Sequence, residues 1–170
     1  MKFLGIDPGL SGAVALIDDD AKIIWLDDMP TLKLTKSRRE IDAREFADWL
    51  EGEAATSTDA PWIDCRAVIE SPGVRPGQSA QSGVKTGVGW GTLVGILVAL
   101  KIPYETVTPQ RWQKAILGNV DRGASKDRSR AFCQREYPSA DLGKRRTQDR
   151  SDALCIARYA WAKWREPDAA

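Results

Sequence analysis

The stretch FLGIDPGLSGAVALI, residues 3–17, places one carboxylate, Asp7, between two apolar runs. The apolar runs predict two buried strands, and the Pro-Gly pair after Asp7 together with Gly12 predicts the turn that joins them. An aspartate before Pro-Gly often only bonds the backbone of its own turn, so this stretch leaves the role of Asp7 open. It contains neither GxGxxG nor GxxxxGK[ST], which weakens the idea of a nucleotide site.

The length and cysteine content of the chain favour one intracellular domain. Its 170 residues can bury a core without disulfides, so we expect a single domain over residues 1–170. Cys65, Cys133 and Cys155 are far apart and form no CxxC pair, which favours reduced thiols over a disulfide framework or a zinc site. No secretory signal pattern opens the chain, and the longest uncharged run, residues 86–100, is shorter than the ~20 residues that cross a bilayer. We therefore expect a soluble, cytoplasmic protein without a membrane partner.

Charge is distributed unevenly along the chain. Residues 1–100 carry 10 Lys and Arg against 15 Asp and Glu, whereas residues 101–165 carry 15 against 7. The basic clusters of the second region suit a phosphate backbone, with a solvated helix face as the alternative. The chain has no histidine, which excludes Ser-His-Asp and Cys-His catalysis and every His-ligated metal site. Any chemistry must use carboxylates, lysines, hydroxyls or thiols.

Hydrophobic periodicity and turn residues predict an α/β fold with a mixed five-stranded sheet flanked by helices. Three antiparallel strands come first, and two further strands alternate with helices. The expected strands cover residues 3–6, 13–17, 22–26, 66–70 and 104–107, and the expected helices begin at Asp42, Ser82, Pro109, Ser125 and Thr147 or Gln148. Residues 30–40 are polar and mixed in charge, and we expect a mobile loop there.

The helix expected over residues 82–100 carries a stripe of glycines. Gly83, Gly87, Gly91 and Gly95 recur at four-residue spacing and therefore share one face. Four glycines weaken a helix by roughly 3 to 4 kcal/mol relative to alanine. We therefore expect close packing to compensate, against another helix of the chain or a partner subunit.

Four carboxylates stand at positions where a fold of this kind can bring them together. Asp7 and Glu70 each end an apolar strand and precede a Pro-Gly turn, and Asp149 and Asp152 share one face of a helix first turn. Acids at a helix N-terminus can simply complement its dipole. Four converging carboxylates would repel one another unless divalent cations lie between them, and two Mg²⁺ ions held in this way carry out phosphodiester hydrolysis. The set therefore predicts a metal site, with Asp7 as a ligand.

Five segments together resemble the RuvC family of Holliday junction resolvases, most closely its short phage-type branch. They are GIDPGLSG with Asp7, VIES with Glu70, PQRWQKAILGN, SKDRSR, and DRSDALCIARYA with Asp149 and Asp152, in the family's order over residues 3–165. The resemblance implies an RNase H-like fold and a homodimer that nicks four-way and other branched DNA in pairs. It also implies two Mg²⁺ ions, for which Mn²⁺ can substitute, and the cytoplasm of a bacterium or of a phage-infected host.

The catalytic and metal-binding residues follow from the same resemblance, whereas most of the expected DNA contacts come from the basic clusters. The four acids match the family's metal ligands and catalytic carboxylates, and Lys114 and Lys126 match basic residues beside the scissile phosphate, Lys126 with a catalytic role. The expected DNA contacts are Arg75, Lys85, Arg111, Lys114, Lys126, Arg128, Arg130, Lys144, Arg145 and Arg146. One departure concerns the stretch after Glu70, SPGVRPGQSAQ, which lacks the aromatic side chain that bacterial members insert into the junction. We therefore expect only a modest preference for junctions over other branched DNA.

Two other enzyme classes remain as alternatives. An RNase H-type nuclease acting on RNA:DNA hybrids would share the fold and the acids, and the sequence does not separate it from a junction nuclease. An actin-like or sugar-kinase-like phosphotransferase also opens with a strand, an aspartate and a glycine turn. Such proteins close two domains over ATP, and the length of this chain argues against them.

Overall fold

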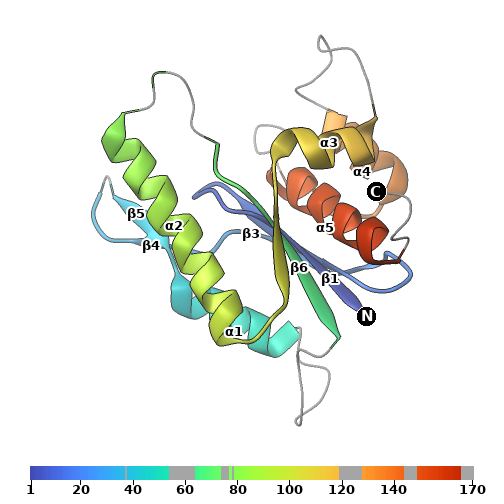
Figure 1. Ribbon diagram of the computed structural model, residues 1–170, viewed down its shortest axis with the longest axis horizontal. Coiled ribbons are helices and arrows are strands. Elements are labelled where there is room, and N and C mark those ends of the chain that lie inside the picture. Colours follow the sequence, from blue (N-terminus) through green and yellow to red (C-terminus); the bar gives the residue numbers. More distant parts are fainter. Residues whose placement is uncertain are drawn as a thin grey trace.

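A computed structural model describes residues 1–36, 38–53, 64–73, 77, 79–118, 128–143 and 149–165. The elements, in chain order, are β1 Lys2–Asp7, β2 Ala13–Ile17, β3 Ile23–Asp28, β4 Thr31–Lys33, β5 Arg39–Ile41, α1 Ala43–Glu53, β6 Cys65–Glu70, α2 Ala80–Ala99, β7 Tyr104–Val107, α3 Pro109–Leu117, α4 Arg128–Glu136 and α5 Asp149–Arg165 (Figure 1). For the elements whose predicted bounds lie in the described residues, expected and observed bounds differ by a few residues at most. The helix starts predicted at Ser125 and at Thr147 or Gln148 lie outside the described residues.

The central sheet confirms the predicted mixed topology. Its strand order is β3-β2-β1-β6-β7. β1 pairs antiparallel with β2, and β2 with β3, whereas β6 lies parallel to β1 and β7 parallel to β6. Because β1 and β6 run side by side in the same direction, their carboxyl ends lie at the same edge of the sheet.

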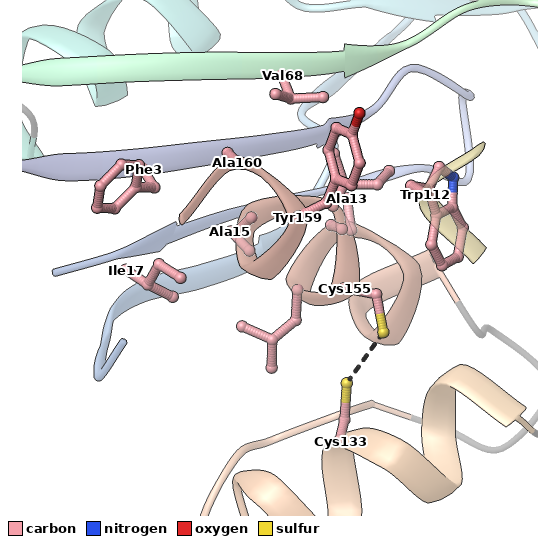
Figure 2. Packing of buried hydrophobic residues seen from close by; sticks show 14 of the residues in the cluster. Phe3, Ala13, Ala15, Ile17, Val68, Trp112, Cys133, Cys155, Tyr159 and Ala160 are labelled. Carbon is pink, nitrogen blue, oxygen red and sulfur yellow. Dashed lines mark hydrogen bonds between the residues drawn. The ribbon is translucent and has the colours of Figure 1, made fainter. Parts of the chain in front are cut away.

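Helices cover both faces of the sheet, as Figure 1 shows. Successive side chains of a strand point to opposite faces. Phe3 accordingly belongs to the buried cluster that includes α5, Trp112 and Cys133 (Figure 2), whereas Leu4 and Ile6 belong to the cluster that includes α1 and α2. The core therefore has two layers, one on each side of the sheet.

α5 packs on β1 at backbone distance, which explains a glycine in the middle of a buried strand. A Cβ atom on Gly5 would lie 2.2 Å from the amide nitrogen of Ala157 and 2.3 Å from the carbonyl oxygen of Ala153. No side chain fits in that space, so only glycine lets the helix lie this close. The two cysteines on this side are also buried, and the sulfur of Cys133 lies 3.8 Å from that of Cys155 (Figure 2).

Residues 30–40 correct the sequence prediction of a loop. The structure has an antiparallel hairpin there, in which Thr31 pairs with Ile41 and Lys33 with Arg39. Its residues are mostly polar, and apolar side chains alternate with polar ones only at Leu32 and Leu34, so the pattern resembles that of a loop. Buried Ile41 at its base gives the segment its anchor.

The glycine stripe of α2 is open in this chain. Among the residues that the structure describes, no atom lies within 4 Å of a Cβ placed on Gly83, Gly87, Gly91 or Gly95. Packing against another helix of the same described chain is therefore the wrong explanation, and a partner subunit remains a prediction. The neighbouring Val84, Val88 and Val98 are also exposed.

α2 is also long and apolar enough to cross a membrane by length and composition alone. An 18-residue window within it has a mean hydropathy of 1.2, and 11% of that window is buried in this structure. Single helices of soluble proteins pass the same criterion, so the expected absence of a membrane partner stays a prediction.

Candidate active site

Three elements bring the four predicted acids to one edge of the sheet. Asp7 is the last residue of β1 and Glu70 the last of β6, and these strands are paired through Ile6 and Ile69. Asp149 and Asp152 occupy the first turn of α5, the helix that packs across β1. All four side chains are partly buried. The fold thus gathers residues that are separated by up to 145 positions in the chain.

Burial and mutual repulsion raise the pKa values of these acids. The pKa of Asp7 rises to about 8, first because it is buried and then because of the charges of Glu70, Asp152 and Asp149. A hydrogen bond from the Gly9 backbone amide acts in the opposite direction. At neutral pH the carboxyl of Asp7 is therefore mainly protonated unless a cation compensates its charge.

The two acids of α5 share this behaviour. Burial raises the pKa of Asp152 to about 6, while a hydrogen bond with Ser129 lowers it and the charge of Asp149 raises it further. The pKa of Asp149 is raised by burial and then by the charge of Asp28, and a hydrogen bond with Ser11 opposes both. Two hydroxyl groups therefore hold two of the four acids.

The donor chemistry of the site fits a hard divalent cation such as Mg²⁺, because all four candidate ligands are carboxylates. A cation between them would remove the repulsion that raises the pKa of Asp7. In the described residues no group of three His, Cys, Asp or Glu side chains has the arrangement of a metal site. The acids are thus electrostatic neighbours, and ligation requires their side chains to draw closer.

Two tryptophans hold Glu70 from two different helices. Trp112 of α3, which is 1% exposed, donates its indole Nε1–H to Oε2 of Glu70 at 2.6 Å. Trp90 of α2 donates its indole Nε1–H to the backbone carbonyl oxygen of Glu70 at 3.1 Å. The first bond orients the carboxylate and the second fixes the strand end that carries it. Trp112 is therefore a positioning residue for Glu70.

Arg150 fastens the start of α5 to the edge of the sheet. Its guanidinium donates to Asp28 at 2.7 Å, to Asp27 at 2.9 Å and to Asp141 at 3.0 Å, and its side chain is 15% exposed. Asp28 pairs with Ala13, which also pairs with Asp7. Three ion pairs on one side chain therefore fix Asp149, the preceding residue, relative to the strand that carries Asp7.

The predicted DNA contacts fall into three groups. Lys85, Arg111 and Lys114 are exposed, and none of the ion pairs among the described residues involves them. Arg128 donates to the carbonyl oxygens of Leu117 and Gly118, and Arg130 donates to those of Leu142 and Gly143, so both tie helix α4 to neighbouring backbone. The remaining predicted contacts, Arg75, Lys126, Lys144, Arg145 and Arg146, lie outside the described residues.

Sequence reasoning missed the residues that support the acids. Nothing in the local pattern joins Trp112 to Glu70, which is 42 positions away. The signal for Arg150 was present, since it stands inside the DxxD pattern, but two of its three partners, Asp27 and Asp28, are more than 120 positions away.

Comparison with known proteins places the fold. No protein-family profile and no curated protein sequence matches this chain. Among solved structures, it is similar to Thermus thermophilus RuvC in complex with a Holliday junction substrate, with a TM-score of 0.63 and 14% identity over 98% of this chain and 96% of that one. A second Thermus thermophilus RuvC structure gives a TM-score of 0.60 and 15% identity over 97% and 96%. The mixed sheet, its flanking helices and this full-length similarity show that the chain has a RuvC-like, RNase H-like fold.

Proposed function

We propose that this protein is a metal-dependent endonuclease that nicks branched DNA, with the Holliday junction as its main substrate. The observation that carries the proposal is the gathering of Asp7, Glu70, Asp149 and Asp152, whose mutual repulsion helps to raise the pKa of Asp7 to about 8. Repulsion among these acids destabilises the metal-free protein, and a bound cation would remove it. Such a destabilising arrangement is expected where a site serves function at the cost of stability. The similarity to a RuvC structure that holds a junction substrate supports the choice of DNA.

In this proposal the four acids hold two Mg²⁺ ions, and Mn²⁺ can take their place. When bound, the two ions would activate the attacking water and stabilise the leaving oxygen. Trp112 keeps the Glu70 carboxylate in one orientation, and Ser11 and Ser129 restrain Asp149 and Asp152. Lys126, a predicted catalytic cation at the scissile phosphate, is the further member of the site. These bonds orient the carboxylates, as hydrogen-bond partners of metal ligands commonly do.

Paired nicking requires two active sites, and we propose a homodimer in the cytoplasm. A two-fold dimer presents the same surface to two symmetry-related strands of a four-way junction. The open face of α2, with its four glycines and the exposed Val84 and Val88, supports this assembly because an apolar face of this kind is normally covered.

Asp149→Asn tests the proposed function directly. This change removes one charged ligand and no basic residue, so nicking of a four-way junction in Mg²⁺ should be lost while junction binding persists. Ca²⁺, which is larger and looser in coordination, should support binding without efficient cutting in the wild-type protein. A nicking rate close to wild type for Asp149→Asn in saturating Mg²⁺ would contradict the assignment of the acids.

The substrate is tested with four nucleic acids of the same sequence: a four-way junction, a three-way fork, a linear duplex and an RNA:DNA hybrid. We expect the junction to be nicked fastest, the fork somewhat more slowly, and the duplex and hybrid slowest. A hybrid cut faster than the junction would favour an RNase H-type nuclease. Duplex cut as fast as the junction would leave a metal nuclease without selectivity for structure.

A further inference from the structure

The β4–β5 hairpin, residues 31–41, is a basic feature in the otherwise acidic first part of the chain. Lys33, Lys36, Arg38 and Arg39 stand within seven positions, against Glu40 alone among the acids of the hairpin. Residues 1–100 contain ten Lys and Arg in total, and four of these ten lie in the hairpin. The net negative charge of residues 1–100 therefore does not describe the hairpin, which is basic.

The hairpin leaves the sheet at the edge that carries the four acids. Its first strand begins three residues after Asp28, the end of β3, and Asp28 and Asp7 both pair with Ala13. The amide of Met29 also donates to the carbonyl oxygen of Gly12 at 2.8 Å, which ties the connection to the turn that follows Asp7. The base of the hairpin is therefore fixed beside the candidate active site.

Contacts with α2 set the direction in which the hairpin projects. Ile41 is 7% exposed, and a Cβ on Gly89 would lie 3.2 Å from its Cδ1 atom, so the base of β5 rests against α2. Figure 1 shows the hairpin extending beside the N-terminal half of that helix. Three strand residues at about 3.4 Å each carry its tip roughly 10 Å beyond this base.

The side chains at the tip are available to a partner. Lys33, Lys36 and Arg38 are exposed, and none of the ion pairs among the described residues involves them. Arg39 instead donates to the hydroxyl oxygen of Thr31 across the hairpin. Leu32 in β4 and Leu34, the residue that follows the end of this strand, are each 44% exposed. The amide of Leu34 still donates to the carbonyl oxygen of Arg38 across the hairpin, at 2.9 Å.

We propose that this hairpin grips branched DNA at the branch point, with Lys33, Lys36 and Arg38 on backbone phosphates and Leu32 and Leu34 against bases where the strands separate. This inference rests on the proposed nuclease function and extends it to a substrate-recognition element. The charge is complementary to a phosphate backbone, and exposed leucines beside cations are the side chains that proteins wedge between base steps. The hairpin would supply the wedge that the stretch after Glu70 lacks.

The phosphate contacts are tested by the salt dependence of junction binding, measured in an Asp149→Asn background so that the DNA stays intact. The combined change Lys33→Ala, Lys36→Ala, Arg38→Ala should flatten the slope of log affinity against log salt by between roughly 0.9 and 2.7, at about 0.9 for each phosphate that the variant no longer neutralises. Lys36→Ala alone is compared with Lys22→Ala, which removes an exposed lysine from the β2–β3 turn at the opposite end of the sheet.

We expect Lys36→Ala to weaken binding at moderate salt several-fold and Lys22→Ala to leave it unchanged. A triple variant with a wild-type melting temperature and a slope equal to that of Lys22→Ala would overturn the inference. If the triple variant fails to fold, the comparison of Lys36→Ala with Lys22→Ala is the test, and equal junction affinities would overturn the inference. Lys36→Ala should fold, because residue 36 is in an exposed bend.

The leucines are tested by the ratio of junction affinity to duplex affinity. Leu32→Ser with Leu34→Ser should lower this ratio several-fold and leave the salt slope unchanged, and an unchanged ratio would overturn their assignment. The three native cysteines are buried, so Leu34→Cys can carry an environment-sensitive dye at one exposed thiol. Its emission should shift more with junction than with duplex, and equal shifts would contradict a contact at the branch point. Absence of junction nicking by the wild-type protein would instead overturn the proposed function, whatever the hairpin variants do.

Discussion

Helices α5 and α2 lie on opposite faces of the same sheet and have opposite relations between composition and burial. α5 carries charged residues along its whole length, yet eight of its residues, Ser151, Ala153, Leu154, Cys155, Ile156, Ala157, Tyr159 and Ala160, are buried. α2 contains one charged residue, Lys85, and buries only Leu93 and Leu97. The hydrophobicity of a helix alone therefore does not predict how much of that helix is buried against the sheet.

The difference lies in what each helix presents to its neighbour. α5 presents small residues to β1 and lies at backbone distance from Gly5, so it is fixed on the sheet and positions two of the four acids. α2 buries two leucines in the core, packs Trp90, Val94 and Ile96 against it only in part, and leaves its glycine face open to the described part of the chain. α5 thus has its partners within the chain, and α2 has room for a partner outside it.

The largest effect is expected where α5 meets the sheet. Gly5→Ala places a Cβ within 2.3 Å of two backbone atoms of α5, and backbone cannot move aside as a flexible side chain can. We expect destabilisation at or beyond the upper end of the ~1 to 3 kcal/mol typical of overpacking, and little soluble protein. Thermal unfolding measures it, with Gly91→Ala on the open face of α2 as the matched control. Equal melting temperatures for Gly5→Ala and wild type would show that α5 does not lie this close.

A second large effect concerns the acids that α5 brings to β1. The pKa of Asp7 is about 8 in the folded protein and close to 3.8 when unfolded, so between these values the folded state binds more protons. The free energy of unfolding of the metal-free protein should therefore fall as pH rises from about 4 to about 8. Asp7→Asn removes this penalty, and we expect it to be more stable than wild type by a few kcal/mol near pH 8 and by little near pH 4.

Urea unfolding in a chelator at several pH values measures this difference. Asp48→Asn, which removes an acid from α1 on the other face, is the control and should show no such trend. A pH-independent gap between Asp7→Asn and wild type would mean that neither burial nor the neighbouring acids raise the pKa of Asp7 in the folded protein. Added Mg²⁺ should stabilise the wild type and have little effect on Asp7→Asn.

An intermediate effect separates the two tryptophans that hold Glu70. Trp112→Phe removes the donor to the carboxylate and should weaken Mn²⁺ binding, measured by calorimetry, by about 10 to 100-fold, as is usual for partners of metal ligands. Trp90→Phe, on α2, removes only the bond to the backbone carbonyl and should change Mn²⁺ affinity by a few-fold at most. Replacing Trp112 with benzothienylalanine, which keeps the ring shape and lacks the N–H, should reproduce the loss. Equal Mn²⁺ affinities for both Phe variants would remove the positioning role of Trp112.

The smallest effect on the single chain is expected on the open face of α2. Gly91→Leu meets no described atom within 4 Å of its Cβ and improves helix propensity, so the isolated chain should gain about 1 kcal/mol or less. The same leucine would obstruct a close helix partner and should dissociate a homodimer formed through this face. Sedimentation velocity over a range of concentrations measures this. A dimer as tight as that of wild type would place the subunit interface elsewhere.

The sequence predicted the sheet because its signals are local. Apolar runs, the Pro-Gly turn after Asp7 and the turn at residues 18–20 identified the first three strands, and the apolar run before Glu70 identified a further one. Strand-terminal acids and a DxxD at a helix start then indicated that the four carboxylates meet, since carboxyl ends of neighbouring parallel strands share an edge. The RuvC-like fold is confirmed by the structure, whereas the metal-binding role of these acids stays a prediction.

Other features depend on contacts between residues that are distant in the sequence, and no local pattern indicated them. The polar hairpin at residues 31–41 depends on the burial of Ile41 against α2. Arg128 and Arg130, predicted for DNA, bind carbonyl oxygens that only the folded chain brings near. The open face of α2 and the bond from Trp112 to Glu70 likewise depend on how distant segments pack together. The sequence shows the hydrophobic periodicity of each helix and strand, but it does not show which face of one element packs on which face of another. That choice depends on the free energy of packing distant elements together, so only the tertiary structure decided it.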